Sequence, residues 1–510
     1  MEVFTDVAAD SFRLGLPTFL RPTGTKTNSE ECIAVTSTTG QLLTALYSIL
    51  ATLLFIVCWK LFNMVVMCFN PSAERYRNII RGIALVGFWN SREPLEAFFF
   101  ILDYLGRVRG ATSSKESHIR RPALMLLAWA FVWLAGTYVA SIFVAAQLIA
   151  GNVAPANPNK VYVPKAEQTG SADTMRLQAL RAPATLRSLG SAEAADGDHT
   201  IRDRFSLVTT PARGDSPYKF VYNYTVKAED MGLQKWYDLK QEVDGWCAID
   251  NSWFSKNDQD ADLDVYRPWE LANKTVNVVY DGERKTAPSA TAIPFPYADS
   301  SFFIGQAVEH RYGIIVHSSH RASHRPGTDP WYETETFTPS ENETDAQIAD
   351  PATNRVKGGR PALSCIQNDV WSYNGRQFKN IYELTDEANI DFPDGWVTQL
   401  QMDFNLPRII DVINSAGSSS LVSSTTFVGG RFDAETSTIE KDMKRLFTAT
   451  WISSAHTFRN MLMVGDKQNI PNAAHTGKDQ PQHGVDLFVV STPKVAALRL
   501  SVLIAIPALL

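Results

Sequence analysis

Four histidines lie close together in the second half of the chain, and their side chains are the ones best suited to bind a metal ion. They are His310, His317, His320 and His324. Imidazoles a few residues apart can converge on zinc or copper. No Cys or Glu completes a known ligand pattern, however, and three interleaved arginines would repel a cation, namely Arg311, Arg321 and Arg325. The pattern favours a solvated loop, and we assign no metal ligand, no cofactor and no catalytic residue.

Four aspartates alternate along a second stretch, as they do at the start of a calcium-binding loop. They are Asp258, Asp260, Asp262 and Asp264. Leu263 stands where that loop needs Gly, and Trp269 stands where it needs Glu, so the sequence does not predict a calcium site. The sequence also lacks a Gly-x-Ser-x-Gly elbow, a phosphate-binding loop and a His-Glu-x-x-His helix.

Three acceptor sequons for N-glycosylation fall in the third and fourth fifths of the chain. They are Asn223-Tyr224-Thr225, Asn273-Lys274-Thr275 and Asn342-Glu343-Thr344. Of the five cysteines, Cys58 and Cys68 belong to an apolar run, and Cys32 stands near the N-terminus. We expect a disulfide between Cys247 and Cys365, and the alternative is a pair of reduced, buried thiols. Closing so long a loop would contribute about 4–5 kcal/mol in the chain-entropy model.

Two apolar runs are long enough to cross a bilayer, whose hydrocarbon core needs about 20 residues of helix. Residues 41–69 contain one charged side chain, Lys60, and residues 122–150 contain no Asp, Glu, Lys, Arg or His. We therefore predict transmembrane helices over both ranges. Gly136 and Ala140 share a face of the second helix, and small residues at this spacing let helices approach closely. Packing against the first span is the modest interpretation, and oligomerisation is the alternative.

The loop between the two runs is the basic part of the chain. Residues 70–121 carry 9 Lys and Arg against 5 Asp and Glu, whereas residues 151–493 carry 33 against 44. Excess positive charge in a short loop marks the cytoplasmic side. We expect short amphipathic helices in this loop, with Phe98, Phe99 and Phe100 as anchors. The extracytoplasmic parts are then the N-terminal tail, residues 1–40, and the long acidic segment.

The acidic segment divides by composition. Residues 151–217 are rich in Ala, Pro, Ser and Asp and are typical of a flexible stalk. Residues 218–493 predict an α+β domain with disordered loops. Strand patterns cover residues 218–226, 276–280 and 314–317, and helix patterns cover residues 230–243, 396–413 and 436–463. The chain ends with residues 495–510, which we expect to form a partial third transmembrane helix.

Several short motifs support a membrane protein. Residues 360–375 read RPALSCIQNDVWSYNG, and they are accompanied by residues 230–234 (DMGLQ), residues 329–332 (DPWY) and the final VLIAIPALL. Together they resemble a group of uncharacterised multi-pass membrane proteins of filamentous fungi. The resemblance implies a longer C-terminal span than the one present, and thus a chain that continues past Leu510. It transfers no catalytic residue.

The function expected from these patterns is that of an integral membrane protein in the plasma membrane or secretory pathway, with a glycosylated ectodomain. We favour a non-enzymatic surface receptor, sensor or scaffold that binds an extracellular or luminal ligand. The alternative is a membrane-anchored enzyme acting on glycan or lipid through acidic residues such as Asp369 or the cluster from Asp258 to Asp264. The lipid bilayer is the other expected partner, and the acidic segment argues against nucleic acid, whose phosphates need clustered cations.

Overall fold

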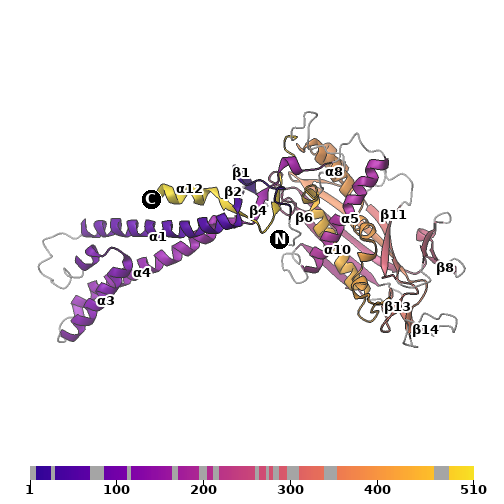
Figure 1. Ribbon diagram of the computed structural model, residues 1–510, viewed down its shortest axis with the longest axis horizontal. Helices are drawn as coiled ribbons and strands as arrows, with labels where there is room; N and C mark the ends of the chain where they lie inside the picture. Colours follow the sequence, from indigo (N-terminus) through magenta and orange to yellow (C-terminus); the bar gives the residue numbers. More distant parts are fainter. Residues whose placement is uncertain are drawn as a thin grey trace. The chain divides into compact units, whose positions relative to one another are not determined.

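The computed structural model describes most of the chain, with gaps between the described stretches. These are residues 7–23, 29–68, 86–111, 117–163, 171–194, 204–210, 218–258, 263–271, 275–279, 286–295, 309–337, 353–463 and 482–509. The contacts divide the chain into two units. The helical unit comprises Leu14–Arg21, Glu30–Ala154 and Pro493–Leu510, and the large unit comprises Met1–Arg13, Pro22–Ser29 and Pro155–Thr492. Figure 1 shows the elements of each unit.

Three helices make up most of the helical unit. They are α1 (Ser37–Cys68), α3 (Pro94–Ala111) and α4 (Ser117–Leu148). Leu, Ala and Met dominate the apolar runs and favour helix, while packing holds the helices together. Trp59 of α1 is fully buried and contacts Phe88 and Trp133. A side chain at Gly136 would meet the ring of Phe55, which confirms that the small face of α4 packs against α1.

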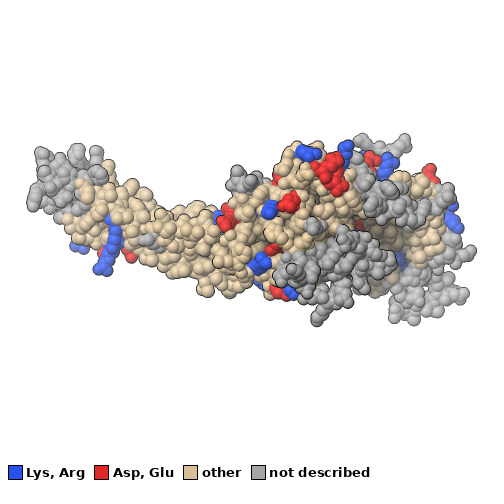
Figure 2. Space-filling view, turned by 90° about the horizontal axis from the view of Figure 1, so that it is seen from above, with Lys and Arg blue, Asp and Glu red and all other residues tan. Residues whose placement is uncertain are grey.

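One helix in the described part of the chain is long and apolar enough to cross a membrane, Ser37–Val65. Two shorter apolar helical segments are Leu124–Ala140 and Leu500–Leu509. Between the long helices, α3 is a single helix of 18 residues, longer than the short helices expected for this loop. Phe99 and Phe100 of α3 remain exposed. Figure 2 shows an uncharged surface along most of the paired helices, with Lys and Arg gathered near α3.

A four-stranded sheet completes the helical unit. Its strands are β1 (Gly15–Arg21), β2 (Glu30–Thr36), β19 (Val495–Arg499) and β3 (Ile149–Gly151), in that spatial order. Three of these strands are continuous in sequence with apolar helices. Strand β2 leads into α1, strand β3 follows α4, and strand β19 leads into α12 (Leu500–Leu509). The chain leaves this unit after β3 and returns at β19, its hydrogen-bonded neighbour. The large unit is therefore inserted between two adjacent strands.

The C-terminal prediction needs correction at this sheet. Residues 495–499 form a buried strand between β2 and β3 rather than the start of a helix, and α12 has ten residues. At 1.5 Å per residue α12 covers about 15 Å, half of a hydrocarbon core. A short apolar run flanked by neighbours on both sides is a buried strand as readily as a helix. Periodicity could not separate the two.

Close packing and one arginine join the sheet to the helices. Gly40 of α1 lies against Ala496 of β19, where an added Cβ would be 2.6 Å from the Ala496 Cβ, so α1 runs tightly along this sheet. Arg499 donates from Nε to Glu30 at 2.8 Å and from Nη1 to the Gln147 carbonyl at 3.0 Å. The last carbonyls of a helix favour a cation. Arg499 thus links the end of α4 to β2 and β19.

The large unit is built on a seven-stranded antiparallel sheet. The spatial order is β11-β12-β16-β7-β6-β5, and β17 pairs with β16. The bounds are β5 (Phe205–Thr210), β6 (Lys219–Lys227), β7 (Lys240–Asp250), β11 (Ser289–Phe295), β12 (Glu309–His317), β16 (Ala362–Tyr373) and β17 (Arg376–Phe378). Buried and accessible residues alternate along β6, β7 and β16, as expected for strands with one covered face.

Helices cover one face of this sheet (Figure 1). They are α5 (Ser171–Ala194), α7 (Ile381–Glu387), α8 (Asp394–Phe404), α9 (Arg408–Ala416), α10 (Ile439–Ala455) and α11 (Thr457–Asn460). Phe447 of α10 stacks on Tyr222 of β6 with ring centroids 3.9 Å apart. Asn414 of α9 makes two hydrogen bonds to the backbone of Ala292 in β11 and so occupies an otherwise unpaired sheet edge.

Two small sheets and several single-turn elements complete the large unit. One sheet consists of β8 (Phe254–Asp258), β9 (Leu263–Tyr266) and β10 (Val276–Val279), and the other of β13 (Ala322–Ser323), β14 (Thr334–Phe337) and β15 (Thr353–Val356). The first packs Tyr266 and Val278 with Trp253 against Ile293 and Ile315. Shorter elements are β4 (Val153–Pro155), β18 (Val489–Ser491), η3 (Pro158–Lys160), η5 (Pro268–Glu270), η7 (Gly417–Ser419) and η8 (Val422–Thr426).

The fold confirms some of the secondary-structure predictions and corrects others. The strands predicted over residues 218–226, 276–280 and 314–317 are present as β6, β10 and part of β12. The helix predicted over residues 396–413 is divided into α8 and α9 at Pro407, which lacks a backbone N–H. The helix predicted over residues 436–463 is likewise divided, into α10 and α11.

Two regional predictions are wrong. Residues 230–243 form turns and the start of β7 instead of a helix, because Gly232 has a φ of +76° and lies against the Val489 carbonyl. The flexible stalk predicted over residues 151–217 includes α5, whose Leu189 and Ala192 are buried, and β5, an edge strand of the main sheet. The Ala-rich composition belongs to a packed helix here, since small residues allow close helix contact.

Candidate functional site

The two faces of the seven-stranded sheet carry different side chains. Residues directly opposite one another on neighbouring antiparallel strands share a face, so the register gives rows that run across the sheet. Tyr222, Gly245, Gln367 and His310 form one row on the helix-covered face. The opposite face, which is called the open face below, carries a second row that consists of Val221, Trp246 and Ile366. Each row carries side chains that could form part of a site.

A hydrogen-bonded chain crosses the helix-covered face. The Tyr222 hydroxyl donates to Gln367 Oε1 at 2.8 Å and lies 2.9 Å from the Tyr312 hydroxyl. It can cross β7 because Gly245 lies beneath it: an added Cβ would be 2.4 Å from the hydroxyl oxygen. Gln367 then donates to Asp369 at 2.7 Å. Glycine at position 245 is therefore required for this chain to form.

Asp369 is the acidic end of that chain and is buried. Loss of hydration on burial raises its pKa to about 7, while the hydrogen bond from Gln367 partly offsets this effect. Tyr224 and Asp369 both lie opposite Val243 of β7 and so share a cross-strand row. Tyr224 is also buried, and burial raises the pKa of its hydroxyl well above the usual value. A carboxyl with such a pKa could exchange a proton near neutral pH, but only with a partner that reaches it.

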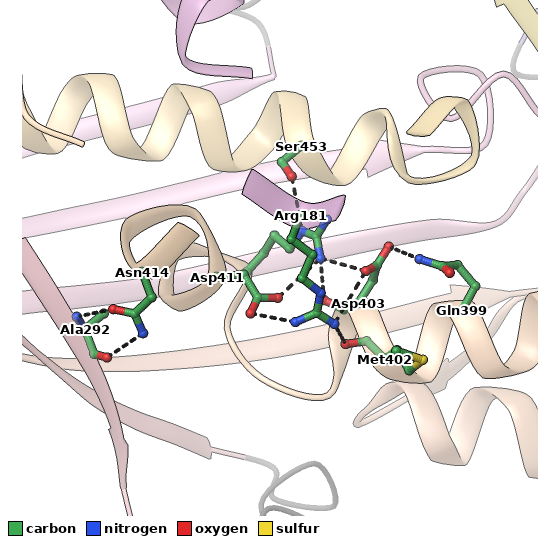
Figure 3. Close-up of polar contacts among 9 residues, drawn as sticks. Arg181, Ala292, Gln399, Met402, Asp403, Asp411, Asn414 and Ser453 are labelled. Atoms are coloured by element: carbon green, nitrogen blue, oxygen red, sulfur yellow. Dashed lines mark hydrogen bonds and ion pairs between the residues drawn. The ribbon is translucent and has the colours of Figure 1, made fainter. Parts of the chain in front are cut away.

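A cluster of two arginines and two aspartates lies between the helices beside this face (Figure 3). Arg408 of α9 donates to Asp403 at 2.8 Å and to Asp411 at 3.3 Å, and its Nε donates to Ser453 of α10 at 3.2 Å. Arg181 of α5 donates to Asp411 at 2.9 Å. Arg408 and Asp403 are buried, and the two carboxylates raise the pKa of the guanidinium against the effect of burial.

This cluster has the chemistry of a structural joint. Two positive and two negative charges balance, and Arg181 also donates to the Met402 carbonyl at 2.8 Å (Figure 3). Removing one partner from such a group leaves an uncompensated buried charge, which costs several kcal/mol. Its residues come from α5, α8, α9 and α10, so it fixes four helices on one another. No carboxylate in it is left without a cation.

The open face carries an apolar row that runs across four strands. The apolar row consists of Val208, Val221, Trp246 and Ile366, in β5, β6, β7 and β16. Val208 is 57% exposed and Val221 is 41% exposed, and Trp246 and Ile366 are half-buried. Lys219 places its ammonium 4.2 Å from the Trp246 ring centroid, which is a cation–π contact. Apolar side chains aligned in this way on an exposed sheet face mark a candidate interaction surface.

A polar row runs alongside the apolar row, two residues further along β6. The polar row consists of Ser206, Asn223, Asp244, Asn368 and Glu309. Asn368 donates to Asp244 at 3.4 Å. Amides, carboxylates and a hydroxyl in a line supply both hydrogen-bond donors and acceptors. The open face therefore combines an aromatic and aliphatic strip with a polar border, an arrangement suited to an amphipathic ligand.

Comparison with known families bears on the large unit. A family model described as "Domain of unknown function (DUF8406)" matches residues 182–490, more than half of the chain. The chain belongs to this family. No curated protein and no solved structure matches it. The matched DUF8406 region includes both faces of the sheet, the two small sheets and the Arg–Asp cluster except Arg181, and it begins inside α5, in the range predicted as stalk.

Within the DUF8406 region the histidines are spread apart. His310 and His317 lie near opposite ends of β12, and burial lowers the pKa of each to about 4. His317 contacts Thr291 at 3.0 Å, and His320 contacts Asn257 at 3.2 Å. His324 follows β13. Across the part of the chain that the structure describes, no group of three or more His, Cys, Asp or Glu is placed to hold a metal ion.

The other predicted residues fall into three groups. Asp264 is buried on β9, where it accepts from Asn257 and from the Gly359 backbone, while Asp260 and Asp262 lie outside the described residues. Asn223 is exposed, whereas Asn273 and Asn342 also lie outside the described part. Cys247 and Cys365 are opposite one another on β7 and β16, with their sulfur atoms 2.06 Å apart, at disulfide-bond distance as predicted.

Sequence reasoning missed the Arg–Asp cluster and the apolar row. One signal for the cluster was present: Arg408 and Asp411 stand among the Ile and Val residues of α9, and charges in such surroundings are normally paired. The apolar row could not be found in this way, because its residues come from strands up to 158 positions apart in the sequence, from Val208 to Ile366. Only the register brings them together.

Proposed function

We propose that this DUF8406 chain is an integral membrane protein that holds its large unit outside the cytoplasm as a non-enzymatic binding domain, in the role of a receptor, sensor or scaffold. The observation that carries the membrane part is the exposure of large apolar side chains on the helical unit. Leu42 of α1 is 73% exposed and Met125 of α4 is 72% exposed. Lipid solvates such side chains, whereas water does so at a cost of about 25 cal/mol per Å².

The orientation follows from charge and from chemistry that needs the secretory pathway. The short loop holding α3 is basic, and such loops stay in the cytoplasm. Both α1 and α4 then span the bilayer, and α12 enters it from the outer side. A disulfide in the large unit suits an oxidising compartment, and Asn223 is exposed for glycosylation. These features agree on a large unit that is extracellular or luminal.

The binding role rests on how the buried polar groups are used. The Arg–Asp cluster is internally balanced, and Asp369 ends a hydrogen-bonded chain covered by helices. Catalysis needs acid and base groups that reach a substrate. In this domain the acidic groups serve the packing of helices on the sheet, while the surface offers exposed side chains for recognition. A domain held at a membrane by this scaffold fits a ligand-binding task.

The second candidate is a membrane-anchored enzyme acting on glycan or lipid. One observation favours it: burial raises the pKa of Asp369 and of Asp442 to about 7 each, and general acid–base catalysts are tuned in that direction. Asp442 accepts hydrogen bonds from the Tyr332 hydroxyl and the Val422 backbone N–H. Those partners give it a complete structural role, which is why we rank the enzyme second.

One experiment separates the two candidates. The full chain in lipid nanodiscs is screened for binding to arrays of glycans and lipids, and each bound compound is then tested for turnover. The proposal expects binding without product. Asp369→Asn is compared with Asp244→Asn, a matched change at an exposed carboxylate of the polar row. Turnover that Asp369→Asn abolishes and Asp244→Asn leaves intact would establish the enzyme instead.

A further inference from the structure

We infer that the N-glycan attached to Asn223 lies across the apolar row of the open face and stacks its first sugar on Trp246. The inference rests on the proposed placement of the large unit outside the cytoplasm. It assigns an occupant to a sheet face that the helices leave uncovered. It also explains why the sequon sits within a strand of the main sheet.

The register places the attachment point beside the strip it would cover. Asn223 and Val221 lie two residues apart on the same face of β6, and their partners on β7 are Asp244 and Trp246. Asn223 and Trp246 are thus diagonal neighbours, a relation that corresponds to about 7–8 Å and lies within reach of large groups. The first sugar on the Asn223 amide can therefore reach the indole without any change in the sheet.

Lys219 and Asn223 flank Val221, the residue opposite Trp246, on either side along β6. Lys219 occupies one side of the Trp246 ring, and it precedes Val221 by two residues, whereas Asn223 follows Val221 by two. The cation and the glycan therefore approach the ring from opposite directions along β6. The axial C–H groups of a pyranose carry slight positive charge and are attracted to the negative face of an aromatic ring. The proposed stacking therefore uses the ring face opposite Lys219.

The polar row supplies the remaining contacts. Asp244 can accept hydrogen bonds from sugar hydroxyls, and Asn368 can both donate and accept. Both are on the row that contains Asn223, directly across β7 and β16. A glycan is bulky and strongly hydrated on its outer side. It would shield Val208, Val221 and Trp246 from water while presenting a soluble surface.

The test uses the full chain expressed in eukaryotic cells, with glycan occupancy at each sequon measured by mass spectrometry. Thr225→Ala removes the sequon without changing Asn223, and Thr225→Ser retains it as the matched control. We expect Thr225→Ala to lower the Tm of the large unit by several degrees and Thr225→Ser to leave it unchanged. Trimming the glycan to its first sugar with an endoglycosidase should also leave the Tm unchanged.

The dependence on Trp246 is tested in two further backgrounds. In Trp246→Phe, which keeps an aromatic face, loss of the sequon should still lower the Tm; in Trp246→Leu it should have little effect. An equal loss in both would overturn the stacking. Acrylamide quenching gives a readout that does not depend on stability. The fluorescence of Trp246 is obtained as the difference between the emission of a chain with Trp246 and that of the same chain with Trp246→Phe. Acrylamide should quench this fluorescence more strongly after Thr225→Ala. Unchanged quenching would also overturn the inference.

Occupancy separates this inference from the proposed function. If Asn273 or Asn342 carries a glycan while Asn223 carries none, the large unit is outside and the inference about Trp246 is wrong. If none of the three is modified, the proposed placement itself fails. A glycan at Asn223, with the Tm dependence above, supports both.

Discussion

The two units of this protein differ in where their large apolar side chains lie. The large unit buries its aromatic side chains against a sheet, and fully buried Trp253, Trp331, Trp371 and Trp396 lie within it. The helical unit leaves large apolar residues exposed along α1 and α4, with Trp59 as its buried centre. This difference is what we expect if, as proposed, water surrounds the large unit and lipid surrounds the helical unit.

The positions of charged side chains also differ between the two units. In the large unit, Arg408 and Asp403 are buried as a pair, and exposed charges are distributed over the surface, as Figure 2 shows. In the helical unit, the ionic contacts recorded among its described residues lie in the sheet or in α3, away from the apolar helix centres. An unpaired charge in hydrocarbon costs several kcal/mol, so this separation is what a bilayer requires.

The largest expected effect concerns the disulfide of the large unit. Replacing both Cys247 and Cys365 by Ala frees a segment of 118 residues and should lower the free energy of unfolding by about 4–5 kcal/mol. Denaturant titration of the full chain in detergent micelles measures the change. Reducing agent should have the same effect on the wild-type chain, and none on the variant. Equal stability of reduced and oxidised wild-type protein would contradict the prediction.

The next effect concerns the buried cation. Arg408→Met leaves Asp403 and Asp411 without their main partner and should cost about 3–5 kcal/mol, because a buried charge is then uncompensated. Arg325→Met removes an exposed pair with Glu435 and should change stability far less, because water and salt screen exposed charges. Thermal unfolding of the two variants side by side tests the distinction. Similar losses would mean that the cluster does not join the helices as described.

A matched pair of substitutions tests the two media directly. Leu53 of α1 is 47% exposed and Val428 of the large unit is 70% exposed. Leu53→Arg should disfavour membrane insertion by about 3 kcal/mol, whereas Val428→Arg should change stability by less than about 0.5 kcal/mol. The fraction of chain resistant to alkaline carbonate extraction measures insertion. If both variants remain fully inserted, α1 does not face lipid at Leu53.

A smaller effect should appear as a pH dependence. Asp369 has a pKa of about 7 in the folded chain against 3.8 in the reference state, so folding takes up a proton between these values. Stability from this group is therefore lost as pH rises from about 4 to 7, and ionised Asp369 costs up to about 4 kcal/mol above that range. Asp369→Asn removes this cost and keeps the oxygen that accepts the hydrogen bond from Gln367. Because the amide does not replace the carboxyl perfectly, we expect the free energy of unfolding to rise by about 2 kcal/mol at pH 8.

The measurement is the Tm of wild type and Asp369→Asn at pH 5 and pH 8. The gain should be present at pH 8 and much smaller at pH 5. His310, His317 and His456 oppose this trend in the wild type, since burial lowers the pKa of each and their contribution is lost as pH falls. The variant comparison cancels these histidines. A gain that is equal at both pH values would show that Asp369 does not titrate in this range.

Structural features that depend only on the residues of one segment could be predicted from the sequence. The apolar run that forms α1 shows itself through length alone, and β6 shows itself through strict alternation. The cysteine pair followed from elimination, because two of the other three cysteines lie in an apolar run and Cys32 stands apart from the folded domain. In each case the signal depends on a single segment and not on its neighbours.

Features that depend on a distant partner could not be predicted. The turn at Gly232 is fixed by Val489, more than 250 residues later, so its helix-like spacing was misleading. The strand β19 exists because β2 and β3 flank it, although its five residues also suit a helix. Trp246 and Asn223 come together only through the register of β6 and β7. Tertiary pairing overrides local preference at each of these places.

We propose that α1 and α4 cross a membrane and leave the large unit on the outer side. Protease protection in sealed microsomes tests it with two epitope insertions in the full chain. One is placed between Gly429 and Gly430 of the large unit, and the other within residues 112–116, between α3 and α4. We predict that protease removes the epitope at residues 112–116 and spares the one at Gly429 until detergent opens the vesicles. Loss of the Gly429 epitope from sealed vesicles would contradict the account.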